Sequence, residues 1–379
     1  MLKKRLFTPG PTSVPEEVLL EMALPVMHHR TDEFKNLASG VLEDLKYVFQ
    51  TNNDVFILAS SGTGAMESAF VNFLSKGEKV IVISAGKFGE RFKEIGLIYG
   101  LNVITIEVEW GKKLAEGVIE KELEKHPDTK AVFATLCETS TGTHFDIRKI
   151  SSVVSRSNDT IFVVDAISAL GAIPCLTDEW MLDVVITGSQ KALMLPPGLA
   201  FISVSEKAWS KAETSNLPKY YFDLKKYRKA ISKNDFPYTI PVSLIAGLQR
   251  SLTLIKATGI EKIWEQHSKR ARATREAFKQ AGLTIFSESP SDAVTAILLP
   301  DKIDGEKLVK LLRNKYGLSI AGGQDKLKGK IIRISHLGWQ DGFDALTAIT
   351  AIGVGLSEMG YNVDIQKAIS VAQQILFSL

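Results

Sequence analysis

The stretch from Ile161 to Lys191 decides the fold: it contains Ile161-Phe162-Val163-Val164-Asp165 and, one crossover later, Val184-Val185-Ile186-Thr187-Gly188-Ser189-Gln190-Lys191. Both segments are short apolar runs of the kind that forms strands covered on both faces of a sheet. The first ends in a carboxylate and the second, after a turn of small residues, in an amine. Open α/β sheets build their sites at the ends of such strands. We therefore expect Asp165 and Lys191 to share one site.

Further apolar runs lie on both sides of this stretch. The predicted strands cover residues 55–58, 80–84, 103–106, 131–136, 161–164, 184–187 and 200–204. Helical patterns at residues 65–74, 90–99 and 147–157 lie between them, after predicted helices at 16–22 and 31–49. Strands that alternate with helices form a mainly parallel sheet. The sequence thus predicts an α/β fold with a mainly parallel, seven-stranded sheet.

The 379 residues are enough for two domains. We expect an extended segment at residues 1–15, a large domain at 16–258 and a smaller C-terminal α+β domain at 259–379. The boundary lies at Thr258-Gly259, where a long helical pattern is broken. In the small domain we expect strands at 293–299, 318–320 and 331–335, helices at 305–316 and 343–357, and a last helix at 365–377.

Composition excludes several function classes. A net charge of +3, without a basic and aromatic groove pattern, argues against nucleic-acid binding. No apolar run approaches the length of a membrane span, and the basic start has no signal-peptide core. Cys137 and Cys175 show no metal-ligand spacing and fit buried thiols in a reducing compartment. We therefore expect a cytoplasmic protein.

The acid and the amine suit pyridoxal phosphate, which needs a lysine to form a Schiff base with its aldehyde and a carboxylate to keep its ring nitrogen protonated. Lys191 leads into the apolar residues Ala192-Leu193-Met194-Leu195. We expect this lysine to be partly desolvated, with a lowered pKa that makes the neutral amine accessible. The alternatives are a solvated surface lysine and an Asp165 that caps a helix at the strand exit.

A glycine-serine loop, Ser60-Ser61-Gly62-Thr63-Gly64-Ala65, follows the first strand and precedes a helix. Glycines let the backbone turn sharply, and free N–H groups at the helix start, with the Thr63 hydroxyl, make an anion pocket for a cofactor phosphate. Plain turn chemistry is the alternative. The loop is not a P-loop, because no Gly-Lys-Ser/Thr follows, and Glu67 stands where a dinucleotide fingerprint has its third glycine.

Further candidates follow other strands at the same edge. Phe88, in Gly86-Lys87-Phe88-Gly89-Glu90, is placed to stack on a planar ring, with a core phenylalanine as the alternative. Thr139, in Glu138-Thr139-Ser140-Thr141-Gly142, offers a hydroxyl to the cofactor, with a polar capping loop as the alternative. Taken together, a phosphate loop, a ring, hydroxyls and the acid–amine pair indicate one cofactor site.

Arg333 is the charged residue of the late apolar run Lys330-Ile331-Ile332-Arg333-Ile334-Ser335. A bidentate guanidinium is a natural receptor for the carboxylate of an amino or keto acid. The alternative is that the side chain points to solvent, because successive side chains along a strand alternate between its two faces. Arg30 is a weaker candidate, since it flanks a helix start, and the adjacent His28 and His29 are interpreted as structural.

Together these segments resemble the class V aminotransferases of the fold-type I pyridoxal phosphate superfamily, and among them the alanine:glyoxylate and serine:pyruvate aminotransferases. The likeness extends from Pro9-Gly10-Pro11 to about Leu356 and is most specific over residues 183–191 with the following Pro196-Pro197-Gly198. It implies that Lys191 is the Schiff-base lysine and catalytic base and that Asp165 pairs with the ring nitrogen. Cofactor contacts are implied for Thr63, Gly64, Ala65, Phe88, Thr139, Gln190, Tyr238 and Thr239, and substrate contacts for Gly10 and Arg333.

The resemblance also implies a homodimer with active sites at the subunit interface. In the family a Tyr-x-x-Thr segment of the neighbouring subunit reaches the phosphate; the matching residues here are Phe236-Pro237-Tyr238-Thr239. Phe236 stands where a tyrosine is frequent, so one phosphate hydrogen bond is either lost or supplied by Tyr238. Phe88 likewise stands where the alanine:glyoxylate enzymes often carry tryptophan.

The implied activity is a ping-pong transamination from a small amino acid, alanine or serine, to glyoxylate or pyruvate. Two alternatives are a pyridoxal phosphate-dependent lyase, such as a cysteine desulfurase, and a noncatalytic subunit that keeps the fold as a scaffold. A desulfurase needs a reactive cysteine on a mobile loop, whereas Cys137 follows a strand and Cys175 sits beside Pro174. The presence of Lys191, Asp165 and Arg333 argues against the scaffold.

Overall fold

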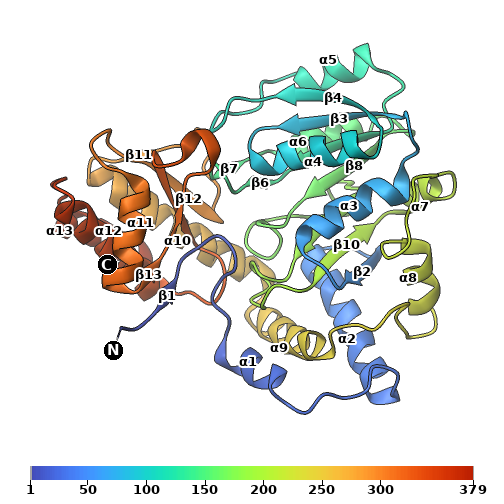
Figure 1. The fold of residues 1–379 in the computed structure, drawn as a ribbon, viewed down its shortest axis with the longest axis horizontal. Helices are drawn as coiled ribbons and strands as arrows, with labels where there is room; N and C mark the ends of the chain where they lie inside the picture. Colours follow the sequence, from blue (N-terminus) through green and yellow to red (C-terminus); the bar gives the residue numbers. More distant parts are fainter. Residues whose placement is uncertain (1, 379) are drawn as a thin grey trace.

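A seven-stranded sheet with the order β2-β10-β9-β8-β5-β3-β4 forms the central layer of the computed structural model, which describes residues 2–378 (Figure 1). Its strands are β2 (Asp54–Leu58), β3 (Lys79–Ser84), β4 (Asn102–Glu107), β5 (Ala131–Thr135), β8 (Ile161–Asp165), β9 (Val184–Gly188) and β10 (Ala200–Val204). β10 is antiparallel to both of its neighbours, and the other paired strands are parallel. The predicted mainly parallel sheet is confirmed.

Helices cover both faces of this sheet, as its apolar strands require. They are α1 (Glu16–Met22), α2 (Asp32–Phe49), α3 (Gly62–Phe73), α4 (Lys87–Ile98), α5 (Val118–Lys125), α6 (Ile147–Val154), α7 (Glu206–Ala212), α8 (Leu224–Ile231) and α9 (Val242–Thr258). Alternate strand residues pack into two separate cores, one against α3, α4, α7 and α8 and the other against α2, α6 and α9. In Figure 1, α3 and α4 lie in front of the sheet.

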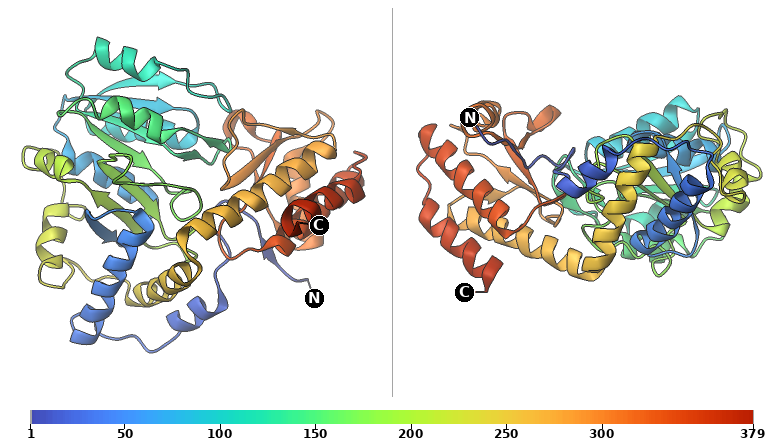
Figure 2. Two further views of the ribbon diagram at one scale, coloured as in Figure 1. Left: turned by 180° about the vertical axis from the view of Figure 1, so that it is seen from behind. Right: turned by 90° about the horizontal axis from the view of Figure 1, so that it is seen from below.

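A second, antiparallel sheet has the order β11-β12-β15-β14. It is built from β11 (Thr284–Ile285), β12 (Val294–Leu298), β14 (Ala321–Gly322) and β15 (Ile331–Ser335), and it is accompanied by α10 (Ile260–Gln280), α11 (Gly305–Tyr316), α12 (Gly342–Glu358), α13 (Ile365–Phe377) and the 3-10 turn η1 (Asp325–Leu327). Helices α9 and α10, separated at Gly259, run from the large sheet to the small one (Figure 2).

The N-terminal segment joins the two parts of the molecule. β1 (Arg5–Leu6) pairs in parallel with β13 (Leu318–Ser319), and the segment then passes between the sheets to α1 (Figure 1). Phe7 is buried in the core of the small sheet. Residues 8–12 are thereby held close to the large sheet's edge. Within residues 2–378 no helix combines the length and the apolar character needed to cross a bilayer.

Helix boundaries differ from the predicted ones at two loops. α3 begins at Gly62 and α4 at Lys87, whereas helices were expected from residues 65 and 90. Gly62 and Gly64 are helical, so sharp turning is not their role. A Cβ at Gly62 would lie 2.6 Å from Ile167 Cδ1 and one at Gly64 would lie 2.6 Å from Ser60 Oγ. These glycines are needed because the helix start packs too closely for a side chain.

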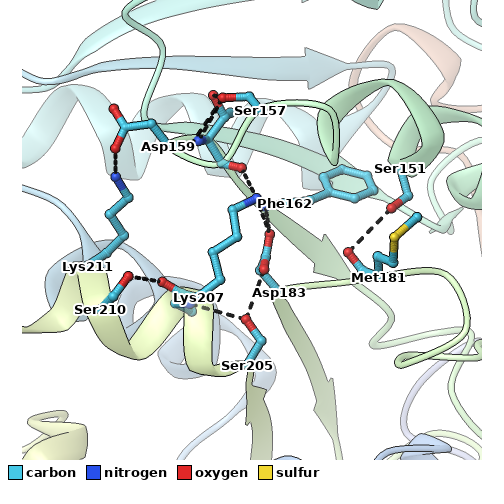
Figure 3. A network of polar contacts seen from close by, with 12 residues as sticks. Ser151, Ser157, Asp159, Phe162, Met181, Asp183, Ser205, Lys207, Ser210 and Lys211 are labelled. Carbon is cyan, nitrogen blue, oxygen red and sulfur yellow. Dashed lines mark hydrogen bonds and ion pairs between the residues drawn. The ribbon is translucent and has the colours of Figure 1, made fainter.

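One buried carboxylate fixes the strand ends opposite the site. Asp183 directly precedes β9; its Oδ2 accepts a hydrogen bond from Phe162 N (2.9 Å) and its Oδ1 accepts one from Ser205 Oγ (2.9 Å) (Figure 3). Lys207 Nζ lies 3.3 Å from Asp183 Oδ2 and donates to the Thr160 carbonyl (2.6 Å). This carboxylate therefore ties β8, β9, the end of β10 and α7 together.

Replacing Asp183 with alanine should lower the free energy of unfolding by about 2–4 kcal/mol, because it leaves the Phe162 amide and the Ser205 hydroxyl without this acceptor and removes the counter-charge of Lys207. Asp159→Ala is the matched control, since Asp159 pairs with Lys130 and Lys211 at an exposed position and should cost only about 0–1 kcal/mol. Urea denaturation measures both changes. Equal midpoints for the two variants would contradict this role of Asp183.

Candidate active site

The carboxyl ends of β2, β3, β5, β8 and β9 meet at one edge of the large sheet, because these strands run in the same direction. Loops from these ends carry the site residues expected from the sequence: Thr63 after β2, Phe88 after β3, Thr139 after β5 and β6 (Cys137–Glu138), Asp165 at the end of β8, and Gln190 and Lys191 after β9. β6 pairs with β7 (Thr143–His144) to form the hairpin that holds Thr139. The edge brings together residues distant in sequence.

Lys191 is buried at this edge, with 8% of its surface exposed. Burial lowers its pKa to about 8, although the nearby Cys137 and Asp165 act in the opposite direction. Nζ donates a hydrogen bond to the carbonyl of Pro9 (2.6 Å). The Thr12 hydroxyl donates to the Lys191 carbonyl (3.0 Å), so the N-terminal segment covers the lysine. The solvated-surface alternative is wrong, and the expected desolvation is confirmed.

Gly10 lies directly against this amine. A Cβ at Gly10 would be 2.6 Å from Lys191 Nζ and 2.7 Å from Cε. Any side chain here would therefore displace the lysine. Gly10 leaves room for the amine and for a group bound to it.

Asp165 lies near the lysine with 3% of its surface exposed. Its Oδ1 accepts a hydrogen bond from Ile167 N (2.8 Å), which closes a turn at the strand exit rather than capping a helix. Burial raises its pKa to about 7; the Ile167 bond and the charges of Lys191 and Arg91 oppose that rise, and Glu138 adds to it. A cation placed against this carboxyl would be required to keep it ionised below neutral pH.

Arg333, on β15 of the small sheet, reaches the same site. Its Nη1 donates to the carbonyl of Thr139 (2.9 Å) and its Nε to the carbonyl of Gly322 (2.9 Å). The side chain is 7% exposed, and burial lowers its pKa to about 10 while Glu138 opposes that shift. The solvent-facing alternative is wrong. A buried guanidinium with a free edge is suited to a carboxylate.

Thr63, Gly64 and Ala65 occupy the first turn of α3. The Thr63 hydroxyl accepts a hydrogen bond from Arg91 Nη1 (3.1 Å), and the Arg91 guanidinium lies 5.0 Å from the centre of the Phe88 ring. Phe88 is half-buried and belongs to neither core, so the core alternative for this ring is wrong. Gly64 N is bonded to the Ser61 carbonyl (2.8 Å), and the start of α3, the Thr63 hydroxyl and the Arg91 cation lie together in an arrangement suited to an anion.

Thr139 and Gln190 line the interior of the site. Thr139 is 2% exposed, and its hydroxyl donates to Ser168 Oγ (2.6 Å). The Oε1 atom of Gln190 is buried and has no hydrogen-bond partner within residues 2–378. An unpartnered buried acceptor is costly unless a bound group supplies a donor.

Tyr238 and Thr239 are not part of the cluster around Lys191. Tyr238 Oη donates to the carbonyl of Tyr220 (2.7 Å), its ring stacks on Tyr221 at 4.9 Å, and Thr239 is exposed. Arg30 forms an exposed ion pair with Asp235 (2.8 Å). Thr239 and Arg30 are therefore on the surface of the protein, whereas Tyr238 is half-buried.

Sequence reasoning missed several groups of the site. Arg91 lies one helical turn beyond Phe88 and was not distinguished from the other basic residues of the chain. The Pro9 carbonyl and Thr12 reach the site from the opposite end of the chain, and no sequence signal announces such a contact. A basic residue one turn into a helix that begins at the sheet edge is a sequence signal that would have identified Arg91.

Comparison with known proteins settles the family. The model of the family described as "Aminotransferase class-V" matches residues 6–337. The chain belongs to the class V aminotransferases. This aminotransferase is 44% identical to the soluble hydrogenase 42 kDa subunit of Anabaena cylindrica, over 95% of this chain and 94% of that protein. It is 34% identical to the serine–glyoxylate aminotransferase of Methylorubrum extorquens, over 99% and 96%.

The fold agrees with that of solved aminotransferases. Pyridoxamine–pyruvate aminotransferase from Mesorhizobium loti superposes with a TM-score of 0.95, at 27% identity, over 100% of this chain and 98% of that one. The predicted fold-type I aminotransferase architecture is therefore confirmed.

Pyridoxal phosphate is the cofactor of this family, and the residues present fit it. The unpartnered Gln190 Oε1 awaits a donor, and the first turn of α3 with Thr63 and Arg91 suits a phosphate. Lys191 and Asp165 provide an amine and a carboxyl in one buried space. Within the described residues 2–378, no group of three or more histidine, cysteine or acidic side chains is arranged to hold a metal ion.

The lowered pKa of Lys191 predicts a pH profile for the cofactor-free protein. The neutral amine is the nucleophile and exists above the pKa, so acetylation of Lys191 by acetic anhydride should rise with a midpoint near pH 8. In denaturant the midpoint should move to about 10.4, the value of an unperturbed lysine. Mass spectrometry of the Lys191 peptide follows the reaction. The same midpoint in both states would contradict the desolvation argument.

Proposed function

We propose that this protein catalyses pyridoxal phosphate-dependent transamination between a small amino acid, alanine or serine, and a 2-oxo acid, glyoxylate or pyruvate. The observation that carries the proposal is the buried Lys191 amine, with a pKa of about 8, beside the buried Asp165. An amine that is available in neutral form near pH 8 is suited to attack a carbonyl and to move a proton. The relatives act on glyoxylate and pyruvate, as their names state.

In the proposed mechanism Lys191 is both the attachment point and the base. Pyridoxal phosphate, when bound, supplies an aldehyde that captures amino groups and a ring that withdraws electrons from the substrate's α-carbon. Lys191 Nζ would take the proton from the α-carbon of the amino acid and hold it for redelivery. Asp165 holds a proton at the ring nitrogen. Thr63, Gly64 and Ala65 bind the phosphate, and Phe88, Thr139 and Gln190 line the ring.

Arg333 binds the substrate carboxylate in this proposal. Its guanidinium is already oriented by the Thr139 and Gly322 carbonyls, so little side-chain freedom is lost when the carboxylate binds. Gly10 has no side chain beside Lys191 Nζ, so a group bound to the amine fits there. Thr12 and the Pro9 carbonyl help to exclude water from the amine.

The proposal includes a homodimer in which Thr239 and Tyr238 of one subunit serve the site of the other. Thr239 is exposed, and it lines a surface hollow together with Val26, His28 and Leu244. Next to this hollow, Leu20 (68%), Leu24 (57%) and Val26 (71%) are exposed large apolar side chains. A patch of this kind supports burial against a second subunit. Cytoplasmic location is supported by the buried free thiols of Cys137 and Cys175.

Alternative functions have weaker support. A desulfurase requires a thiolate, but burial raises the pKa of Cys137 and of Cys175 to about 12, so both are neutral thiols. The relative named as a hydrogenase subunit favours a noncatalytic role within a larger complex as the second candidate. A scaffold has no use for a desolvated lysine beside a carboxyl, and this favours transamination.

A spectral screen of amino acids tests the function. Purified protein with added pyridoxal phosphate should be yellow, and alanine or serine should convert it to the pyridoxamine form, which glyoxylate or pyruvate reverses. Lys191→Ala should abolish turnover and lose covalent retention of the cofactor after borohydride reduction, with the fold intact by circular dichroism. A colourless wild-type protein, or one that no amino acid converts, would support the scaffold instead.

A surface substitution tests the dimer. Leu20→Asp should shift sedimentation from dimer to monomer and weaken pyridoxal phosphate binding about tenfold, because a buried charge opposes association and the Thr239 contact is lost. Ile98→Asp is the matched control, since Ile98 is 80% exposed on α4, away from the hollow. A monomeric wild-type protein, or equal effects of both variants, would refute the proposed interface.

A further inference from the structure

Glu138 is a buried carboxylate that the proposed mechanism leaves without a role. It ends β6, next to Thr139, and its exposed surface is 0%. Burial raises its pKa, while hydrogen bonds from Ser140, Gly89 and Phe88 act in the opposite direction. A buried acid is costly unless its oxygens are satisfied. Donors from neighbouring residues must therefore satisfy its oxygens.

The donors to Glu138 come from two loops of the site. Its Oε2 accepts hydrogen bonds from Phe88 N and Gly89 N, each at 3.1 Å. Its Oε1 accepts from Ser140 N (3.2 Å) and from the Ser140 hydroxyl, which itself accepts from Lys87 N (3.1 Å). One carboxylate thus fastens the first turn of α4, which carries Phe88, to the loop after β6.

The start of α4 and the loop after β6 are packed so closely that neither can move toward the other. A Cβ at Gly86 would lie 2.4 Å from Ser140 Oγ and 2.5 Å from Glu138 Cδ. The two hydrogen bonds from Phe88 N and Gly89 N to Glu138, with the bond from Lys87 N to Ser140 Oγ, oppose their separation. Glu138 therefore helps to fix the backbone position of Phe88.

The same loop orients Arg333. The carbonyl of Thr139, the residue after Glu138, accepts from Arg333 Nη1 at 2.9 Å. The negative charge of Glu138 also supports the charged form of the buried Arg333 guanidinium. The ring at one side of the site and the guanidinium at the other thus share one anchor.

We propose that Glu138 is a positioning residue that places Phe88 for the cofactor ring and Arg333 for the substrate carboxylate through a single carboxylate. This inference rests on the proposed function. Glutamine cannot replace the acid, because its amide NH₂ would face backbone N–H groups or the Ser140 donors, and two donors repel each other. A residue that only caps α4 would affect stability without coupling the two sides of the site.

Glu138→Gln tests the coupling, with Glu90→Gln as the matched control. Glu90 lies in the same first turn of α4 and forms a partly exposed ion pair with Lys87 (3.0 Å). Glu138→Gln should raise the dissociation constant of pyridoxal phosphate and the KM of the amino donor, each about tenfold, because the charge-assisted hydrogen bonds that place Phe88 and the Thr139 loop are lost, and with them the negative charge that supports Arg333. It should also reduce the circular dichroism induced in the bound cofactor. Glu90→Gln should change none of these.

Two single-sided variants separate coupling from general damage. Phe88→Leu should alter cofactor affinity and induced circular dichroism with the KM of the donor retained. Arg333→Lys should raise the KM with the cofactor signal retained. If Glu138→Gln changes only one of these readouts, or only the thermal stability, the coupling proposal is overturned.

Hydrogen exchange of the cofactor-free protein tests the role of Glu138 independently of the proposed function. The amides of Phe88 and Gly89 should exchange at least about tenfold faster in Glu138→Gln than in Glu90→Gln, because their acceptor is lost. Ser140→Ala keeps the acid and should give an intermediate rate, which covers the case in which Glu138→Gln does not fold. Unchanged exchange of the Phe88 and Gly89 amides would contradict the positioning role of Glu138. A wild-type protein that binds no pyridoxal phosphate would refute the proposed function. The hydrogen-exchange rates would then decide whether Glu138 holds the start of α4.

Discussion

The cost of keeping the amine of Lys191 away from water is the physical constraint on which the site depends. The ammonium form is destabilised because burial removes its hydration, and a pKa of about 8 is the consequence. Two distant parts of the chain create that burial: the strand β9, which delivers the lysine to the sheet edge, and residues 8–12, which cover it. The pairing of β1 with β13 holds this cover in place, so the chemistry of the large sheet depends on a strand contact made at the small one.

The charges around the amine are arranged so that none of them is isolated. Asp165 and Glu138 are buried acids, and Lys191, Arg333 and Arg91 are the bases that act on them. In a low-dielectric interior each group depends on its neighbours for its protonation state. Asp165 has a pKa near 7, so both of its protonation states are populated near neutral pH. A cationic ring nitrogen would pair with its carboxylate form. A cation beside Asp165 would lower the pKa of this carboxyl and favour its ionised form.

Much of the fold and the centre of the site could be predicted from the sequence, because they depend on local patterns. The apolar runs predicted the strands of the large sheet, and the residues at their ends predicted Asp165 and Lys191. Arg91 could not be predicted, since its importance comes from a hydrogen bond to Thr63 across two loops. Alternation along β15 left the direction of Arg333 open, because the Thr139 carbonyl that receives it belongs to the other sheet.

The two ends of β9 show how stability and chemistry are divided within one strand. Asp183 at its start is satisfied by neighbouring strands and by Lys207, and none of its partners touches the lysine. Lys191, beyond its end, carries a destabilised charge that such a network would neutralise. A strand fixed firmly at its far end can deliver a desolvated amine at its near end without losing register. The segment 183–191 therefore joins a structural acid to a desolvated amine, and the five-residue strand between them keeps the two environments apart.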